Sequence, residues 1–170
     1  MPHTSPDHAA ATSPVAELRF DHHTFGAYCY DTRSCRIVYD GHEHVASSQE
    51  HDARALDPVN DPPSWRGGEI VDRTFPGPVE ISWQSLDGTP LKASIDLDRI
   101  FKDRRILHRV PKNELPKNAL VDDPAIIVVV DNRKVDVYMR AFVPTLSEQI
   151  PGNSHSTART DLMLAWSHTY

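Results

Sequence analysis

Histidines and cysteines in the first half of the chain are the residues whose types and spacing could do metal chemistry. His42 and His44 stand two residues apart, so on a strand both imidazoles would lie on one face, and His22 precedes them. Neutral imidazole suits zinc or copper, and Cys29 and Cys35 could add thiolates. No pair has the Cys-x-x-Cys or helical His-x-x-x-His spacing of strong zinc signatures. A metal-binding protein or metal-dependent enzyme is therefore the alternative interpretation, and no cofactor is predicted.

Signals for other kinds of catalysis are weak. The chain has no Gly-x-Ser-x-Gly elbow, no phosphate-binding loop and no dinucleotide fingerprint. Ser154 stands beside His155, but neighbours in sequence do not make the geometry of a catalytic triad. We therefore predict a protein that is not an enzyme.

Charged residues are distributed unevenly, which indicates either two solvated loop regions or a patch that docks a partner of opposite charge. The irregular segment 49–68 is acidic and contains Trp65, an aromatic of the kind that interface centres favour. The segment 99–117 is basic, and it is the second candidate for docking. Trp65 could anchor a partner or fold back onto the core. The predicted partner-binding residues are Glu50, Asp52, Asp57, Asp61 and Trp65.

Length and composition limit the function classes. The chain of 170 residues carries 24 acidic against 18 basic side chains, so general nucleic-acid binding is disfavoured. No apolar run approaches the roughly 20 residues of a membrane-spanning helix. The sequence as written lacks a secretory signal, which predicts a cytoplasmic protein. Cys29 and Cys35 could form a bridge if their Cα atoms lie within about 7 Å, whereas two buried reduced thiols are the default in a reducing cytoplasm.

Alternating apolar residues predict several β-hairpins. The strands are expected at 24–30 with 35–39, at 79–84 with 91–97, and at 126–130 with 135–141. The run 126–130 is apolar on both faces and is expected at the centre of a sheet, whereas 135–141 is expected to be half-exposed. Short helices are expected within 98–107 and 157–166. The prediction is a mainly β (or α+β) fold of antiparallel hairpins forming a sheet or sandwich, with one domain over 17–170 and a disordered tail over 1–16.

Four stretches together resemble a family of small bacterial proteins that are poorly characterised and often envelope lipoproteins. They are FDHHT at 20–24, the segment 29–35, GEIVDRTFPGPVEISWQSLDGTPLKASIDL at 68–97, and VVVDNRKVDVYMRAF at 128–142. Some members are encoded beside lipase effectors of type VI secretion and act as immunity proteins. The resemblance implies a non-enzymatic inhibitor that binds a cognate lipase effector. This chain lacks the signal peptide and lipidated cysteine of the lipoprotein members, although a periplasmic location stays open. An accessory module of a secretion assembly is a further alternative.

Overall fold

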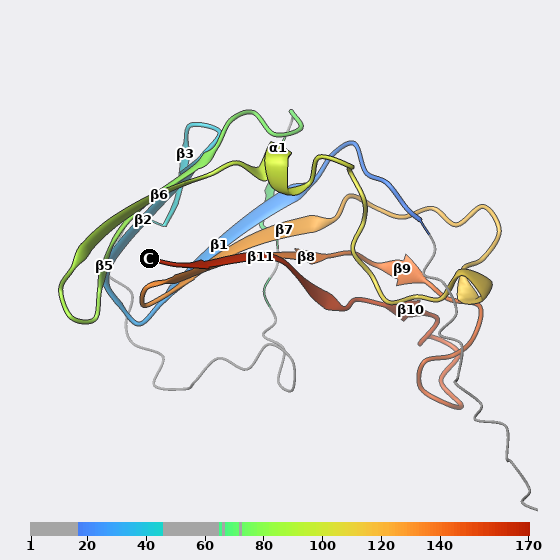
Figure 1. The fold of residues 1–170 in the computed structure, drawn as a ribbon. Helices are drawn as coiled ribbons and strands as arrows, with labels where there is room; N and C mark the ends of the chain where they lie inside the picture. Colours follow the sequence, from blue (N-terminus) through green and yellow to red (C-terminus); the bar gives the residue numbers. More distant parts are fainter. Residues whose placement is uncertain (1–16, 46–64, 66, 72) are drawn as a thin grey trace, which may run out of the picture.

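Two β-sheets pack face to face around the core (Figure 1). The computed structural model describes residues 17–45, 65, 67–71 and 73–170. The five-stranded sheet has the order β11-β8-β7-β1-β4, where β1 is Thr24–Tyr30, β4 Glu69–Ile70, β7 Ala125–Asp131, β8 Lys134–Arg140 and β11 Leu162–Thr169. The four-stranded sheet has the order β3-β2-β5-β6, where β2 is Thr32–Tyr39, β3 His42–Val45, β5 Val79–Ser85 and β6 Pro90–Ile95. A small third sheet pairs β9 (Val143–Pro144) with β10 (Ala158–Arg159).

The predicted hairpin at the centre of the fold is confirmed as β7 and β8. Asp131 pairs with Lys134 across a two-residue turn, in which Asn132 takes a left-handed conformation that asparagine tolerates. β1 lies parallel to β7 on its other side, so β7 is an interior strand and its apolar run is buried on both faces. The expectation that the second arm is half-exposed is wrong. Residues 135–139 are all buried, because the outward face of β8 is covered by the indole of Trp65 and by neighbouring side chains.

The hairpin predicted around Asp87 and Gly88 is also confirmed, as β5 and β6. Gly88 has a φ of +85°, a conformation that favours glycine. Trp83, Ile81 and Ile95 all point inward and share one apolar cluster with the inward face of β7. The fold is therefore mainly β with antiparallel sheets, as predicted; β1 and β7 supply a parallel pair within it.

The cysteine-flanked hairpin expected at 24–39 does not form. Only Asp31 separates β1 from β2, too short a link to fold one strand back alongside the other. Asp31 has a φ of +49°, and the chain turns there from one sheet into the other. β1 pairs with β7 and β4, while β2 pairs with β5 and β3.

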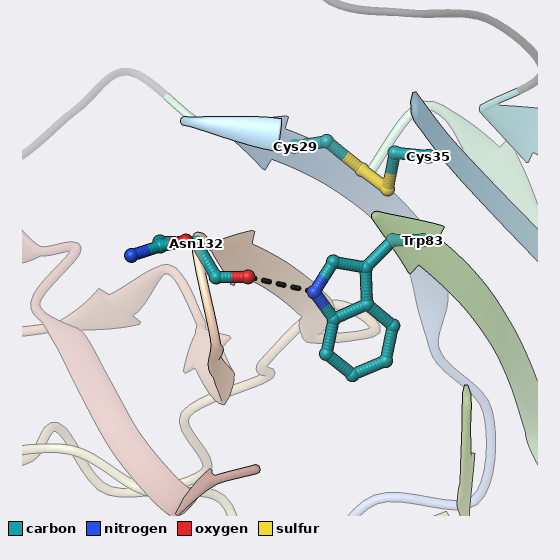
Figure 2. Close-up of a disulfide and its surroundings, with 4 residues drawn as sticks. All are labelled: Cys29, Cys35, Trp83 and Asn132. Carbon is teal, nitrogen blue, oxygen red and sulfur yellow. Dashed lines mark hydrogen bonds between the residues drawn. A yellow bond between two sulfur atoms is a disulfide. The ribbon is translucent and has the colours of Figure 1, made fainter. Parts of the chain in front are cut away.

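A disulfide joins the two sheets at this corner, so the expectation of two reduced thiols is also wrong in the structure. Cys29 of β1 and Cys35 of β2 are bonded, with their Cα atoms 6.5 Å apart, and both are buried. Figure 2 shows the bond near the indole of Trp83, whose Nε1–H donates to the Asn132 carbonyl at 2.6 Å. Closing so short a loop stabilises a fold by about 2 kcal/mol, because it restricts the unfolded chain.

The two expected helices fare differently. A short helix does follow the third hairpin: α1 spans Leu97–Ile100, and Asp96 caps it by accepting from the Arg99 backbone N–H at 3.2 Å. The expected C-terminal helix is wrong. That stretch is the edge strand β11, which pairs with β8 along 162–169, so the hydrogen-bonding edge of the sheet overrides the local spacing. Among the described residues, the longest helical elements are far too short to cross a membrane. The predicted tail at 1–16 lies outside the described residues.

Candidate partner-binding surface

Three large apolar side chains stand in solvent on the connection between β8 and β10. Phe142 is 58 % exposed, Leu146 61 % and Ile150 59 %. They come from one short stretch that leaves β8, forms β9, and continues into the loop that leads to β10 (Figure 1). We call these three residues the apolar loop surface. Single exposed apolar residues are common on proteins, whereas three within nine positions of chain make this connection a candidate for an interaction site.

The loop that carries this surface is held by its own hydrogen bonds. The Thr145 and Gln149 backbone N–H groups donate to the carbonyls of Thr157 and Ser156 at 3.0 and 2.8 Å. The Ile150 N–H donates to Ser156 Oγ at 2.9 Å, and the Gly152 N–H donates to a Glu148 carboxylate oxygen at 2.9 Å. Because the backbone is fixed while the side chains remain in water, a partner would have little chain to order on binding.

A second segment supports the loop from outside the hairpin. The short 3₁₀ helix η1 (Lys112–Glu114) lies against it: the Leu146 N–H donates to the Glu114 carbonyl at 2.7 Å. Ser147 donates to the Glu114 carboxylate from both its backbone N–H and its hydroxyl, at 3.2 and 2.5 Å. Lys112 and Lys117 flank Glu114 in sequence and are exposed, and within the described part of the chain neither forms an ion pair. The charge around the loop is mixed, because Glu148 on the loop is exposed as well.

The residues predicted from the sequence to bind a partner are placed differently. Trp65 is 3 % exposed, so it folds back onto the core and does not stand in solvent as an anchor for a partner. Its indole N–H donates to the Tyr30 hydroxyl at 2.8 Å, and its ring packs on Tyr28 and Tyr138. Arg140 donates to the Trp65 carbonyl at 2.8 Å. The other four predicted residues, Glu50, Asp52, Asp57 and Asp61, lie outside the described residues.

Beside Trp65, the same sheet face holds a buried carboxylate. Asp136 is buried on β8 and accepts from the Tyr138 hydroxyl at 3.1 Å and from Ser167 Oγ, with Lys134 Nζ at 3.0 Å. Burial, together with the negative charge of Asp136, raises the pKa of Tyr138. Burial and the nearby Asp31 raise the pKa of Asp131. With its oxygens occupied by donors, Asp136 is a structural group that holds β8 and β11 together.

The histidines considered as metal ligands do not converge. His22 and His42 are exposed, and His44 packs edge-on against Phe25 with ring centres 4.7 Å apart. No group of three or more potential ligands comes together among the residues that the structure describes. His23, their neighbour, is fully buried, and its Nε2 lies 2.9 Å from the Tyr39 hydroxyl.

Comparison with known proteins finds no matching family model, no matching curated protein and no matching solved structure. The site therefore rests on its own geometry. Sequence reasoning missed the apolar loop surface because Phe142, Leu146 and Ile150 stand four residues apart, a helix-like spacing, in a stretch where Pro144 and Pro151 argue against a helix. The signal that was available is three large apolar residues in a stretch punctuated by Pro144 and Pro151, where a loop is expected to be polar.

Proposed function

We propose that this chain is a non-enzymatic binding protein that docks on a partner protein through the apolar loop surface. The observation that carries the proposal is the combination of an ordered backbone and three exposed apolar side chains. A free protein gains nothing from holding such side chains in water, whereas burying them in a partner removes apolar area from solvent.

We propose further that the partner is a lipase effector of type VI secretion and that the chain is its immunity protein. Support comes from the resemblance of the four stretches given above to a family with such members. Inhibition would be stoichiometric: the loop would occupy the entrance to the lipase active site or block the movement of its lid. In the alternative function, the chain would be an accessory module of a secretion assembly. It would then bind its partner through the same surface without inhibiting an enzyme.

Binding kinetics with a lipase encoded next to this chain test the proposal. We expect the double variant Leu146→Ala/Ile150→Ala to raise Kd at least about tenfold, mostly through faster dissociation, because exposed anchors become buried in the complex. Its melting temperature should not change, since both side chains are exposed in the free protein.

Leu86→Ala is the matched control. Leu86 is also an exposed leucine, but it lies in the β5–β6 connection, at the opposite end of the molecule from β9 and β10 (Figure 1). Wild-type kinetics in the double variant would rule out the apolar loop surface. If the neighbouring lipase binds but keeps its full activity, the chain is a binding protein for that lipase and the proposal that it inhibits the enzyme is wrong.

We also propose that the protein works in an oxidising compartment, the periplasmic alternative left open above. The Cys29–Cys35 disulfide supports this, since such bonds persist in oxidising compartments and are rare in the cytosol.

Thiol labelling of the protein taken from its native cells and denatured at once should find no reactive cysteine until a reductant is added. Cell fractionation should recover it with periplasmic markers. Two thiols that react without reductant would restore the cytoplasmic prediction.

A further inference from the structure

A sheet edge follows the apolar loop surface along the chain, on β11. β11 is the outermost strand of the five-stranded sheet, and within the residues that the structure describes it pairs with β8 alone. The segment 162–169 contains no Lys, Arg, Asp or Glu, so it lacks the charged side chains with which edge strands usually prevent pairing. Leu164 on this strand is 55 % exposed. The strand therefore offers both main-chain groups and apolar area to another chain.

Two adjoining hollows border this edge. The first, about 230 Å³, lies between α1 with its following turn and β11, and it is lined by Phe101, Leu107, Leu164 and Ala165 among others. The second, about 290 Å³, is lined by Leu18, Ile106 and Met163 among others. Arg105 and Leu107 line both, so the hollows are neighbours. We call the two hollows and the edge at 162–165 the β11 groove.

The spacing of the hollows matches the repeat of an extended chain. Met163 lines the second hollow, and Leu164 and Ala165 line the first. Alternate side chains of an extended chain are separated by about 6.5 Å and share a face. A segment added along this edge would therefore reach the two adjacent hollows with two of its alternate side chains. Ala165 falls at the register shift between Leu164 and Trp166, where a bulge bends the edge, and this confines docking to the first half of β11.

Charge around the groove selects the kind of segment. Residues 97–109 carry five basic side chains against two acidic ones, although the whole chain has a net charge of −6. Asp98 is already paired with Arg104 at 2.8 Å. Glu17, at the second hollow, is paired with Arg19 at 2.6 Å and with Arg105 at 3.6 Å. Asp103 also lines the first hollow, but exposed Arg99 and Lys102 stand on the same turn. The excess of positive charge favours acidic residues in the incoming chain.

We propose that the β11 groove receives an extended segment of a partner protein, with apolar side chains two residues apart and acidic residues between them. The inference deepens the proposed function and rests on it in one respect: the segment would belong to the same partner. Binding at two separate places would explain how a small inhibitor gains affinity beyond that of one loop.

A synthetic peptide tests the groove without the partner. We would titrate the ¹⁵N-labelled chain with the blocked peptide Gly-Glu-Leu-Glu-Val-Glu-Leu-Gly and follow amide shifts by NMR. We expect saturable shifts centred on 105–107 and 162–165. The same peptide with lysine in place of glutamate should bind at least about tenfold more weakly, because it meets like charge.

Two variants and one control make the outcome decisive. Ala165→Trp should fill the first hollow and abolish binding of the acidic peptide, with amide shifts elsewhere unchanged. Arg105→Glu, a change at an exposed side chain that lines both hollows, should reverse the preference between the two peptides. Leu146→Ala should bind the acidic peptide as the wild type does, because it alters only the apolar loop surface.

Three results would overturn the inference: shifts that map elsewhere, equal affinity for both peptides, or no binding of either. Shifts of β11 amides that depend on protein concentration without peptide would show that a second copy of the chain occupies the edge instead. If the peptide does not bind but the lipase binds through the apolar loop surface, only the proposal for the β11 groove is wrong. If the peptide binds but the lipase does not, only the proposed function is wrong.

Discussion

Replacing Trp83 with alanine should lower the free energy of unfolding by about 3–5 kcal/mol, as deletion of a buried aromatic side chain does. The indole is 3 % exposed and lies on the inward face of β5, within the cluster that joins the two sheets. It also packs edge-on against Tyr170, with ring centres 5.4 Å apart. Alanine would leave a cavity between the two sheets. The sheets cannot move together to fill it, because the Cys29–Cys35 disulfide joins them nearby (Figure 2). Urea denaturation followed by circular dichroism measures the change.

The variant Trp83→Phe separates packing from hydrogen bonding. Phenylalanine keeps most of the ring but cannot donate to the Asn132 carbonyl, so we expect a loss of about 1–2 kcal/mol. Asn132 is in the β7–β8 turn, and its side-chain oxygen also accepts from the Leu86 N–H at 3.0 Å. The Leu86–Asn132 bond links the β5–β6 and β7–β8 turns, and the Trp83–Asn132 bond ties β5 to the same β7–β8 turn. A loss below 1 kcal/mol in the alanine variant would contradict this account of the core.

Those two hairpins could be predicted from sequence because their determinants are local. Strict alternation sets which face of β5 and β6 is buried, and Asp87 with Gly88 supplies the turn between them. The β7–β8 turn is similarly encoded at Asn132. Neither signal says which strand pairs with which beyond its own hairpin. The parallel pairing of β1 with β7 joins residues about a hundred positions apart, which no local pattern encodes.

The absent hairpin at 24–39 and the absent C-terminal helix have the same cause, which is tertiary pairing of strands. Thr24–Tyr30 and Thr32–Tyr39 are both strands, as their composition indicates, yet a single residue, Asp31, sends them into different sheets. The segment Leu162–Thr169 has apolar residues that fit a helix as well as an edge strand. Its conformation is decided by the open edge of β8, a feature of the assembled sheet.

The candidate site shows the limit of residue type as a guide to exposure. Trp65 was predicted to bind a partner because it is an aromatic residue within an acidic segment, but the sequence does not distinguish an exposed tryptophan from a buried one. Its hydrogen bond to Tyr30 and its contact with Tyr138 hold it on the sheet. The residues that are exposed, Leu146 and Ile150, are apolar ones between the segments for which the sequence predicts a strand or a helix. What distinguishes them is the tight hydrogen bonding of their loop, visible only in three dimensions.

Lowering the pH from 6.5 to 4 should remove about 3 kcal/mol of stability through His23 alone. Burial of the imidazole, with the positive charge of Arg104 and then His22 nearby, lowers the pKa of His23 from 6.5 to about 4. The imidazole contacts the Tyr39 hydroxyl and stacks on Phe75, with ring centres 5.0 Å apart. The Arg104 guanidinium lies over the Phe75 ring, 4.4 Å from its centre. The unfolded chain therefore binds a proton at a pH where the folded protein does not. Its contribution to stability is complete above pH 6.5 and is lost as the pH falls towards 4.

Urea denaturation at several pH values, for the wild type and for His23→Gln, measures this contribution. Urea is preferred to guanidinium because it adds no salt. Carboxyl groups also titrate in this range, among them Asp131, whose pKa is raised, so the informative quantity is the wild-type curve minus the variant curve. We expect that difference to fall by about 3 kcal/mol between pH 6.5 and 4 and to be level above pH 7. His22→Gln is the matched control, because His22 is exposed next to His23 and is the last of the three causes of the lowered pKa of His23, so most of the pH-dependent fall should remain in this variant. Parallel curves for wild type and His23→Gln would mean that His23 accepts a proton in the folded protein, and that the packing against Phe75 and Tyr39 opens to water.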